Sequence, residues 1–189
     1  EENKMEEAQE YYLKAKDEVD LLDDYFLKYL IYSGLGHVYA HTLPDYAMEY
    51  YAQALEYAQS INTPKQVAFS WIASSYIARM YEKKKEYQLS IDNYKKAANT
   101  AKGNNEFLKQ SLSLKELATI YRKTKEYKNA LSCMQEVINI EKLHDVDVGE
   151  VKYLTLGRIY KELDLQDSVI YNFKKALRSP NIRTKIGAY

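Results

Sequence analysis

The 189-residue sequence has a single cysteine, Cys133, and few residues that break helices: three prolines and six glycines. One cysteine excludes an internal disulfide, so cysteine usage does not decide the redox compartment. So little glycine and proline excludes a loop-rich β fold and a disordered linker. The length suits either one sizeable core or an elongated array with a continuous core.

The chain also lacks net charge and long apolar runs. Lysine and arginine together number 27, as do aspartate and glutamate, so the formal net charge is +0. This balance removes the electrostatic argument for non-specific binding of nucleic acid or an anionic membrane. No run approaches the ~18 apolar residues of a membrane span, and no signal peptide is visible. We therefore predict no nucleic-acid binding and no membrane insertion by this chain.

Tyrosine, by contrast, is abundant, with 20 residues. Four of the tyrosines recur 42, 40 and 39 residues apart: Tyr39, Tyr81, Tyr121 and Tyr160. Each has a small residue three positions before it: Gly36, Ala78, Ala118 and Gly157. A small side chain lets two helices approach closely, and we expect the tyrosine one turn on to fill the groove beside it.

A second helical pattern follows each of these tyrosines after a short polar turn. Its first marker comes nine residues later in three units, at Ser90, Ala130 and Val169, and eight residues later at Ala47. Further markers follow at helical spacing: Tyr51, Tyr94, Met134 and Phe173, then Ala54, Ala97, Val137 and Ala176. Such a helix pair cannot bury its apolar faces alone, so the pairs must stack.

The repeat predicts a leading unpaired helix, four helix pairs and a truncated final helix. The expected units are residues 1–22, 23–61, 62–103, 104–145, 146–179 and 180–189. Capping boxes are expected at Thr63 with Gln66, where Pro64 suits the first helical position, and at Asp147 with Glu150. Ser179-Pro180 would start the last helix. Since both ends of the chain fall inside helical patterns, we expect it to be a fragment of a longer protein.

This spacing resembles the tetratricopeptide repeat (TPR), whose pattern is Leu-Gly-x-x-Tyr, then Ala, then an aromatic residue, then Ala. Gly36 and Gly157 match the glycine of that pattern, and Ala78 and Ala118 replace it. The resemblance covers nearly the whole chain and implies an all-α, right-handed superhelix of helix pairs. The period of about 40 residues exceeds the usual ~34, which indicates longer helices and connections. An armadillo or HEAT-like array is the structural alternative.

The final segment, LGRIYKELDLQDSVIYNFKKAL followed by RSPNIRTKIGAY, is similar to bacterial TPR proteins whose repeats precede a membrane span and an effector segment. That similarity implies the extracytoplasmic, periplasmic sensing part of a membrane-anchored regulator. Without it, the chain would be expected in the cytoplasm. The sequence itself does not fix the compartment, the partner or the oligomeric state, although the apolar ends of an array invite self-association.

The TPR resemblance implies that the first helix of each pair lines a concave groove, so binding residues are sought there. Helical phase selects basic and polar positions on those helices: His37, Arg79, Lys83, Lys115, Thr119, Arg122 and Arg158. One interpretation is a basic groove for an acidic or C-terminal peptide. The other is that these side chains are solvated and are neutralised by Glu82, Glu116 and Glu162.

No motif indicates catalysis, a cofactor or a metal. The sequence has no GxSxG, no P-loop and no dinucleotide-binding fingerprint, and Cys133 has no predictable histidine partner. His37 and His41 have the spacing of a metal pair, but a third ligand is missing. We therefore predict a non-catalytic scaffold that binds a peptide or protein segment. The alternative is a ligand- or partner-sensing domain of a bacterial regulator.

Overall fold

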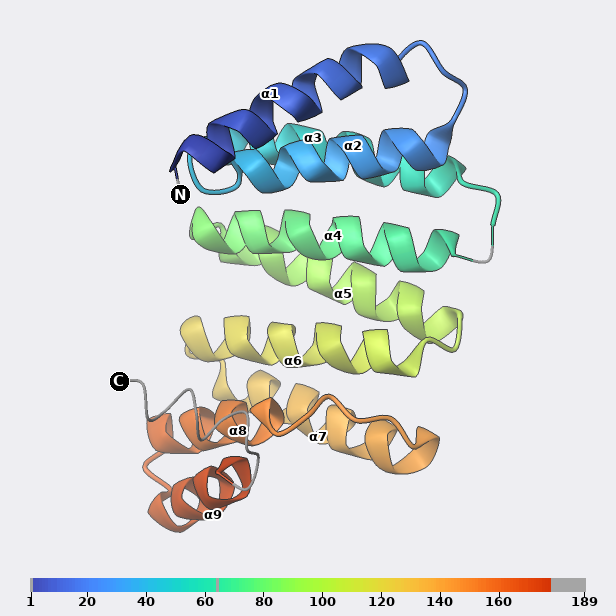
Figure 1. Cartoon of the computed structure of the whole chain (residues 1–189). Helices are drawn as coiled ribbons and strands as arrows, with labels where there is room; N and C mark the ends of the chain where they lie inside the picture. The colour runs from blue at the N-terminus through green and yellow to red at the C-terminus, as the bar shows by residue number, and fades with distance from the viewer. Residues whose placement is uncertain (1, 64, 178–189) are drawn as a thin grey trace. The chain divides into compact units, whose positions relative to one another are not determined.

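The computed structural model describes residues 2–63 and 65–177, and these residues form nine α-helices and no strand. The helices are α1 (Glu2–Val19), α2 (Tyr25–Tyr39), α3 (Pro44–Ser60), α4 (Gln66–Lys83), α5 (Tyr87–Gly103), α6 (Phe107–Lys123), α7 (Tyr127–His144), α8 (Val151–Glu162) and α9 (Gln166–Ala176). Figure 1 shows them along the chain. The expected final helix beginning at Ser179-Pro180 lies outside the described residues.

The chain divides into two compact units, Glu1–Ala97 and Ala98–Tyr189, with the division inside α5. In the first unit α2 packs against α1 and α3, and α3 also packs against α4. In the second unit α6 packs against α7, α8 packs against α9, and both α6 and α7 contact α8. Each unit is thus built from neighbouring antiparallel helices (Figure 1).

Glycine allows the closest helix approaches inside the pairs. A Cβ at Gly36 would lie 2.5 Å from the ring of Tyr51 on α3, and one at Gly157 would lie 2.3 Å from the ring of Phe173 on α9. The small residue therefore faces the aromatic marker of the second helix. The ring directly over the glycine comes from across the pair, and Tyr39, one turn on, is buried in the same cluster as Leu35 and Tyr51.

The turn that joins the two helices of a pair has the same geometry after α4, α6 and α8. Lys85, Lys125 and Asp164 have positive φ angles of 62°, 64° and 55°. The next amide in each case bonds back to the repeat tyrosine: Glu86 to Tyr81, Glu126 to Tyr121 and Leu165 to Tyr160. This six-to-one bond defines a Schellman C-cap. The carbonyl of each repeat tyrosine therefore anchors the turn.

The turn between α2 and α3 differs from the other three, as expected from the eight-residue spacing between Tyr39 and Ala47. Here Leu43 N donates to the Tyr39 carbonyl at 2.9 Å, which is a five-to-one bond. No residue of this turn has a positive φ angle. The one-residue deletion before Ala47 thus removes the left-handed residue and shortens the closing bond by one residue.

Neither expected capping box forms. Gln66 Nε2 donates to the Gln59 carbonyl, and the residue that caps α4 is Lys65, with no side-chain bond. Pro64 lies outside the described residues. Asp147 instead accepts bonds from the Gly149 amide at 2.9 Å and from Lys152 Nζ at 2.7 Å. The helices α4 and α8 have Lys65 and Glu150 at their N-caps, two and three residues later than the expected capping boxes require.

Candidate functional site

The groove residues expected in the first unit lie near the C-terminal ends of α2 and α4. His37, Arg79 and Lys83 are all exposed. His37 Nδ1 lies 3.0 Å from the Tyr51 hydroxyl, within hydrogen-bond distance. Burial raises the pKa of Tyr51, so the phenol stays neutral. This contact engages Nδ1 and leaves Nε2 of the exposed His37 for other partners.

An aromatic ring connects His37 to Arg79. The Tyr76 ring on α4 meets the His37 ring edge-on, with centroids 4.5 Å apart. Arg79 Cζ lies 5.8 Å from the centroid of the same Tyr76 ring. The structure therefore brings two of the predicted binding residues together around Tyr76, which the sequence left unplaced.

Lys83 has a structural contact as well. Its Nζ donates to the Ala40 carbonyl at 3.1 Å, at the C-terminal end of α2. A cation there satisfies a helix-terminal carbonyl and interacts favourably with the helix dipole. Lys83 thus links α4 to α2, and its charge is partly committed to this link.

In the second unit the predicted residues are more strongly engaged with neighbouring acids. Lys115 pairs with Glu116 at 3.1 Å, and Arg122 pairs with Glu162 on α8 at 3.7 Å. Thr119 Oγ1 donates to the Lys115 carbonyl, and Arg158 is exposed. The neutralising glutamates of the second sequence interpretation are therefore in place at Glu116 and Glu162.

Sequence reasoning missed an apolar half of the same surface. Positions seven and eleven residues before a residue fall within about 20° of it on a helix. For four of the groove residues the helical positions at these spacings are apolar: Phe26 and Leu30 before His37, Ala68 and Ile72 before Arg79, Leu108 and Leu112 before Thr119, and Val151 before Arg158. We call these residues, together with the basic ones, the first-helix stripe.

Four members of the stripe are unusually exposed for apolar side chains. Phe26 is 42% exposed, Leu30 43%, Leu108 44% and Val151 44%. The helices α2, α6 and α8 thus each have exposed apolar residues near their beginning and a polar or basic end along one line, whereas Ala68 and Ile72 on α4 are half-buried. Exposed apolar residues in a row indicate an interaction surface more than a solvated helix face.

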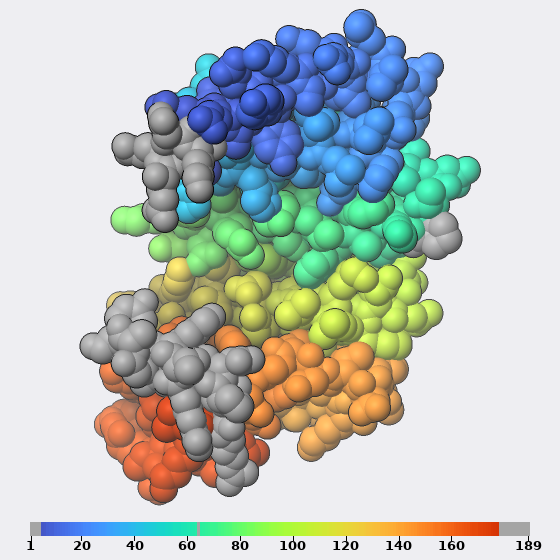
Figure 2. Space-filling view, viewed as in Figure 1, coloured from blue at the N-terminus to red at the C-terminus, as the bar shows by residue number. Residues whose placement is uncertain are grey.

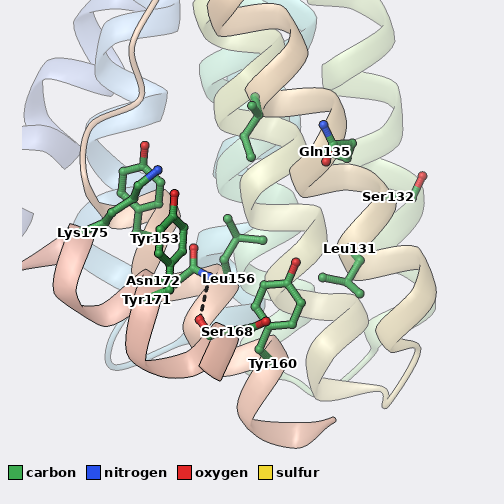
Figure 3. Close-up of a pocket in the computed structure, with 11 residues that line it drawn as sticks. Leu131, Ser132, Gln135, Tyr153, Leu156, Tyr160, Ser168, Tyr171, Asn172 and Lys175 are labelled. Carbon is green, nitrogen blue, oxygen red and sulfur yellow. Dashed lines mark hydrogen bonds between the residues drawn. The ribbon is translucent and has the colours of Figure 1, made fainter. Parts of the chain in front are cut away.

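A pocket of about 580 Å³ lies between α7, α8 and α9 in the second unit. It is lined by Leu131, Ser132, Gln135, Ile138, Tyr153, Leu156, Tyr160, Ser168, Tyr171, Asn172 and Lys175. In Figure 3, Lys175, Tyr153 and Tyr171 gather on one side, and Asn172 and Leu156 lie between them and the α7 side chains.

This pocket is separate from the first-helix stripe. Tyr153, Leu156 and Tyr160 lie about 160–220° around α8 from Arg158, at 100° per residue. Arg158 is accordingly absent from the pocket lining. The helix α8 therefore offers two different surfaces, the stripe on one face and the pocket on the other.

The described residues hold no group of three or more His, Cys, Asp or Glu side chains that could bind a metal. His41 is exposed, and Nδ1 of His37 is already bonded to Tyr51. Over the same part of the chain, no helix combines the length and the hydropathy that crossing a bilayer requires.

Comparison with known proteins shows similarity in structure alone. No family model matches the sequence, and no curated protein does so either. Among solved structures, BtubC (BKLC) from P. vanneervenii superposes with a TM-score of 0.79 at 19% identity, covering 100% of this chain and 76% of that one.

Two further structures are informative. The TPR-like repeats of a putative kinesin light chain from Podosopora anserina give a TM-score of 0.71 at 15% identity, over 94% of this chain and 87% of that one. A Rap protein complexed with competence and sporulation factor gives 0.73 at 15% identity, over 94% of this chain and 49% of that one. This chain therefore spans about half the length of the Rap protein.

Successive helix pairs whose two helices pack closely at a small residue define a repeat solenoid. The chain has the TPR fold, and the all-α solenoid expected from the sequence is confirmed. The membrane-anchored regulator stays a prediction from the sequence.

Proposed function

We propose that the chain is a non-catalytic scaffold whose first-helix stripe binds a segment of a partner protein. The apolar beginning of each stripe would take large apolar side chains, and the basic end would take carboxylates. His37 and Arg79 in the first unit, and Lys115, Thr119, Arg122 and Arg158 in the second, are the polar binding residues of this proposal. Lys83 is also a binding residue in this proposal, because its ammonium group lies beside the Ala40 carbonyl at the end of α2.

The observation that carries the proposal is the exposed apolar pair Phe26 and Leu30 in line with His37 on α2. A merely solvated helix face has no reason to expose a phenylalanine and a leucine one turn apart. The polar groups at its end support the same function, because the Arg79 guanidinium suits a carboxylate and Nε2 of His37 lies at the same end of the stripe.

The Rap protein is a solved TPR-like neighbour in complex with a factor, which supports binding as a use of this fold. Charge arrangement supports a modest rather than a strong preference for acidic segments. Glu116 and Glu162 already pair with Lys115 and Arg122, whereas Arg79 lies against the Tyr76 ring beside His37. We therefore place the main contact on α2 and α4.

The test is selection from a displayed library of random 12-residue peptides on the immobilised chain. Enriched peptides should have large apolar residues beside Asp or Glu. Trp71, the one tryptophan, lies on α4 and reports binding by its fluorescence. Leu30→Ser and Arg79→Glu should each weaken binding about tenfold, whereas Lys96→Glu on α5 should not. No enrichment, or equal binding by all three variants, would reject the stripe.

A further inference from the structure

The repeat gives the chain two equivalent sets of three helices, α1–α3 in the first unit and α7–α9 in the second. In the first set, Gly36 lies under the ring of Tyr51. In the second set, Gly157 lies under the ring of Phe173 in the same way. Counted from these residues, four further positions correspond in order: Tyr32, Tyr39, Tyr46 and Tyr50 in the first set, and Tyr153, Tyr160, Ser168 and Asn172 in the second. The tyrosines of the first helix are therefore kept, and those of the second helix are replaced by small polar residues.

In the first set, rings from α3 cover the two tyrosines of α2. The Tyr50 ring stacks on the Tyr39 ring, with centroids 5.5 Å apart and an interplanar angle of 12°. It also meets the Tyr32 ring edge-on, with centroids 6.0 Å apart. Tyr46 adds a second ring, 5.9 Å from that of Tyr39. Tyr32 and Tyr39 are consequently only 3% and 8% exposed.

In the second set, the pocket of about 580 Å³ lies where those covering rings would be. All four corresponding residues line it: Tyr153, Tyr160, Ser168 and Asn172. Asn172 is turned back onto its own helix, where its Nδ2 donates to the Ser168 carbonyl at 2.8 Å. Tyr153 and Tyr160 are half-buried, and Asn172 and Leu156 lie between them (Figure 3). The pocket therefore corresponds to the space that two tyrosine rings occupy in the first set.

The rest of the lining suits an uncharged ring. Leu131 and Ile138 on α7 supply apolar contacts. Lys175 is the one charged residue among the described residues that line the pocket. Its Nζ already lies over the rings of Tyr153 and Tyr171, 5.0 and 4.6 Å from their centroids, so the ligand needs no charge of its own.

The size and the rim of the pocket suit a ring that is attached to a peptide backbone. The volume falls in the range of pockets that hold drug-sized ligands, which is more than one ring needs. Ser132 and Gln135 of the lining are exposed on α7. Their hydroxyl and amide groups can bond to the N–H and C=O groups of a peptide.

We propose that this pocket binds an aromatic side chain of a partner protein. The ring stacks on Tyr160 and meets Tyr153 edge-on, which are the two contacts that Tyr50 makes with its own neighbours on α2. Stacked and edge-on arrangements are the preferred ones for aromatic pairs, and they add to the gain from apolar burial. The site thus selects an aromatic side chain over an aliphatic one of the same size.

NMR titration of the full chain with two capped amino acids tests this selection. N-acetyl-phenylalaninamide and N-acetyl-cyclohexylalaninamide share a backbone and have similar side-chain volumes, but only the first has an aromatic ring. The phenylalanine probe should bind about two- to tenfold more tightly, as the usual strength of an aromatic pair implies. Equal or tighter binding of the cyclohexylalanine probe, or no binding of either at millimolar concentration, would overturn the proposal.

Filling the pocket from within locates the binding. Ser168→Tyr/Asn172→Tyr supplies the two rings of the first set and should weaken binding of the phenylalanine probe at least about tenfold. Lys174→Tyr adds a ring on the exposed side of α9 and should leave the affinity unchanged. Unchanged affinity of the filled variant would reject the site.

A second variant decides if the filled one does not fold. Tyr160→Leu removes the stacking surface, so the preference for phenylalanine over cyclohexylalanine should disappear. Tyr11→Leu changes a tyrosine that is 71% exposed on α1, and it should keep the preference. A preference that survives Tyr160→Leu would show that the ring does not stack there.

A longer probe tests the assignment to a partner protein. A capped hexapeptide of serine and glycine with one phenylalanine should bind more tightly than N-acetyl-phenylalaninamide, because its backbone can reach Ser132 and Gln135. Equal or weaker binding of the hexapeptide would assign the pocket to a free aromatic compound and would overturn the partner protein as its ligand.

This site is independent of the first-helix stripe. Leu30→Ser and Arg79→Glu should leave the preference for phenylalanine in the pocket unchanged. The filled variant should still bind the stripe peptides that Arg79→Glu weakens. Failure of one proposal is therefore visible without failure of the other.

Discussion

Gly157 on α8 lies against the ring of Phe173 on α9, and a Cβ at Gly157 would stand 2.3 Å from Cε1 of that ring. Real Cβ contacts are not this short, so Gly157→Ala must push the two helices apart or turn the ring. We expect it to lower the free energy of unfolding by about 1–3 kcal/mol, the usual cost of overpacking. Urea denaturation followed by circular dichroism measures this.

Gly103 is the matched control, because a Cβ there meets no atom within 4 Å. Gly103→Ala at the end of α5 should be neutral or stabilise by up to about 1 kcal/mol. Phe173→Leu in the Gly157→Ala background should recover part of the loss. If the two alanine variants had the same effect, close approach of α8 and α9 would not explain the glycine.

A second prediction concerns the left-handed residue of the turn between α6 and α7. Lys125 has φ 64°, a conformation that costs an L-residue about 1–2 kcal/mol. Glycine adopts it freely, although it also gains entropy in the unfolded chain. Lys125→Gly should therefore raise the free energy of unfolding by about 0.5–1 kcal/mol, seen as a higher urea midpoint.

The control for this substitution lies three residues further on. Lys128 is exposed within α7, where glycine should cost about 1 kcal/mol. Opposite signs for Lys125→Gly and Lys128→Gly are expected. A loss of stability at both positions would contradict the Schellman turn.

A third prediction concerns Lys152, which clamps the connection between α7 and α8. Its Nζ lies 3.0 Å from Glu141 Oε1 and 2.7 Å from Asp147 Oδ1, and Glu141 also accepts from the Val148 amide. The side chains of Lys152 and Glu141 are both 11% exposed. Lys152→Met would leave Glu141 without its cation, so we expect a loss of about 1–3 kcal/mol in urea denaturation.

The same cluster predicts a pH dependence. Burial lowers the pKa of Lys152, but bonds to Asp147 and Glu141 outweigh burial and raise it overall. The bond from Lys152, with that from the Gly149 amide, lowers the pKa of Asp147. A raised lysine pKa stabilises below its unfolded value of about 10.4 and the effect is lost above it. A lowered aspartate pKa stabilises above about 3.9 and the effect is lost in acid.

The difference in stability between wild type and Lys152→Met should therefore be largest between about pH 5 and pH 10 and shrink in more acidic and more alkaline solution. Lys142→Met, an exposed change on α7, should give a flat difference. A difference for Lys152→Met that stays constant from about pH 3 to about pH 12 would show that the ion pairs do not contribute.

The periodic residues predicted the helix pairs because each repeat needs the same small and bulky side chains at the same contacts. Gly36 and Gly157 were found for this reason. Which ring covers each glycine depends on the partner helix, and only the structure shows that Tyr51 and Phe173 do so. Local spacing could not choose between Tyr39, on the same helix as Gly36, and Tyr51, on the partner helix α3.

The turns and the pocket could not be predicted for other reasons. Lysine is a poor signal for a left-handed residue, so Lys85 and Lys125 read as ordinary turn residues. Asn172 looks like any polar residue of an amphipathic helix until its burial is known. Phe26 and Leu30 did carry a usable signal, seven and eleven residues before His37, but apolar residues at helical spacing read first as core.

Binding by the first-helix stripe is the central claim, and charge reversal tests it most directly. A fluorescently labelled peptide from the library selection is titrated with wild type, with Arg79→Glu/Arg122→Glu/Arg158→Glu, and with the control Lys96→Glu/Lys128→Glu/Lys142→Glu, all helical in circular dichroism. The account predicts at least about tenfold weaker binding for the arginine variant and no more than about twofold for the lysine control. Equal affinity of the arginine variant and wild type would contradict it.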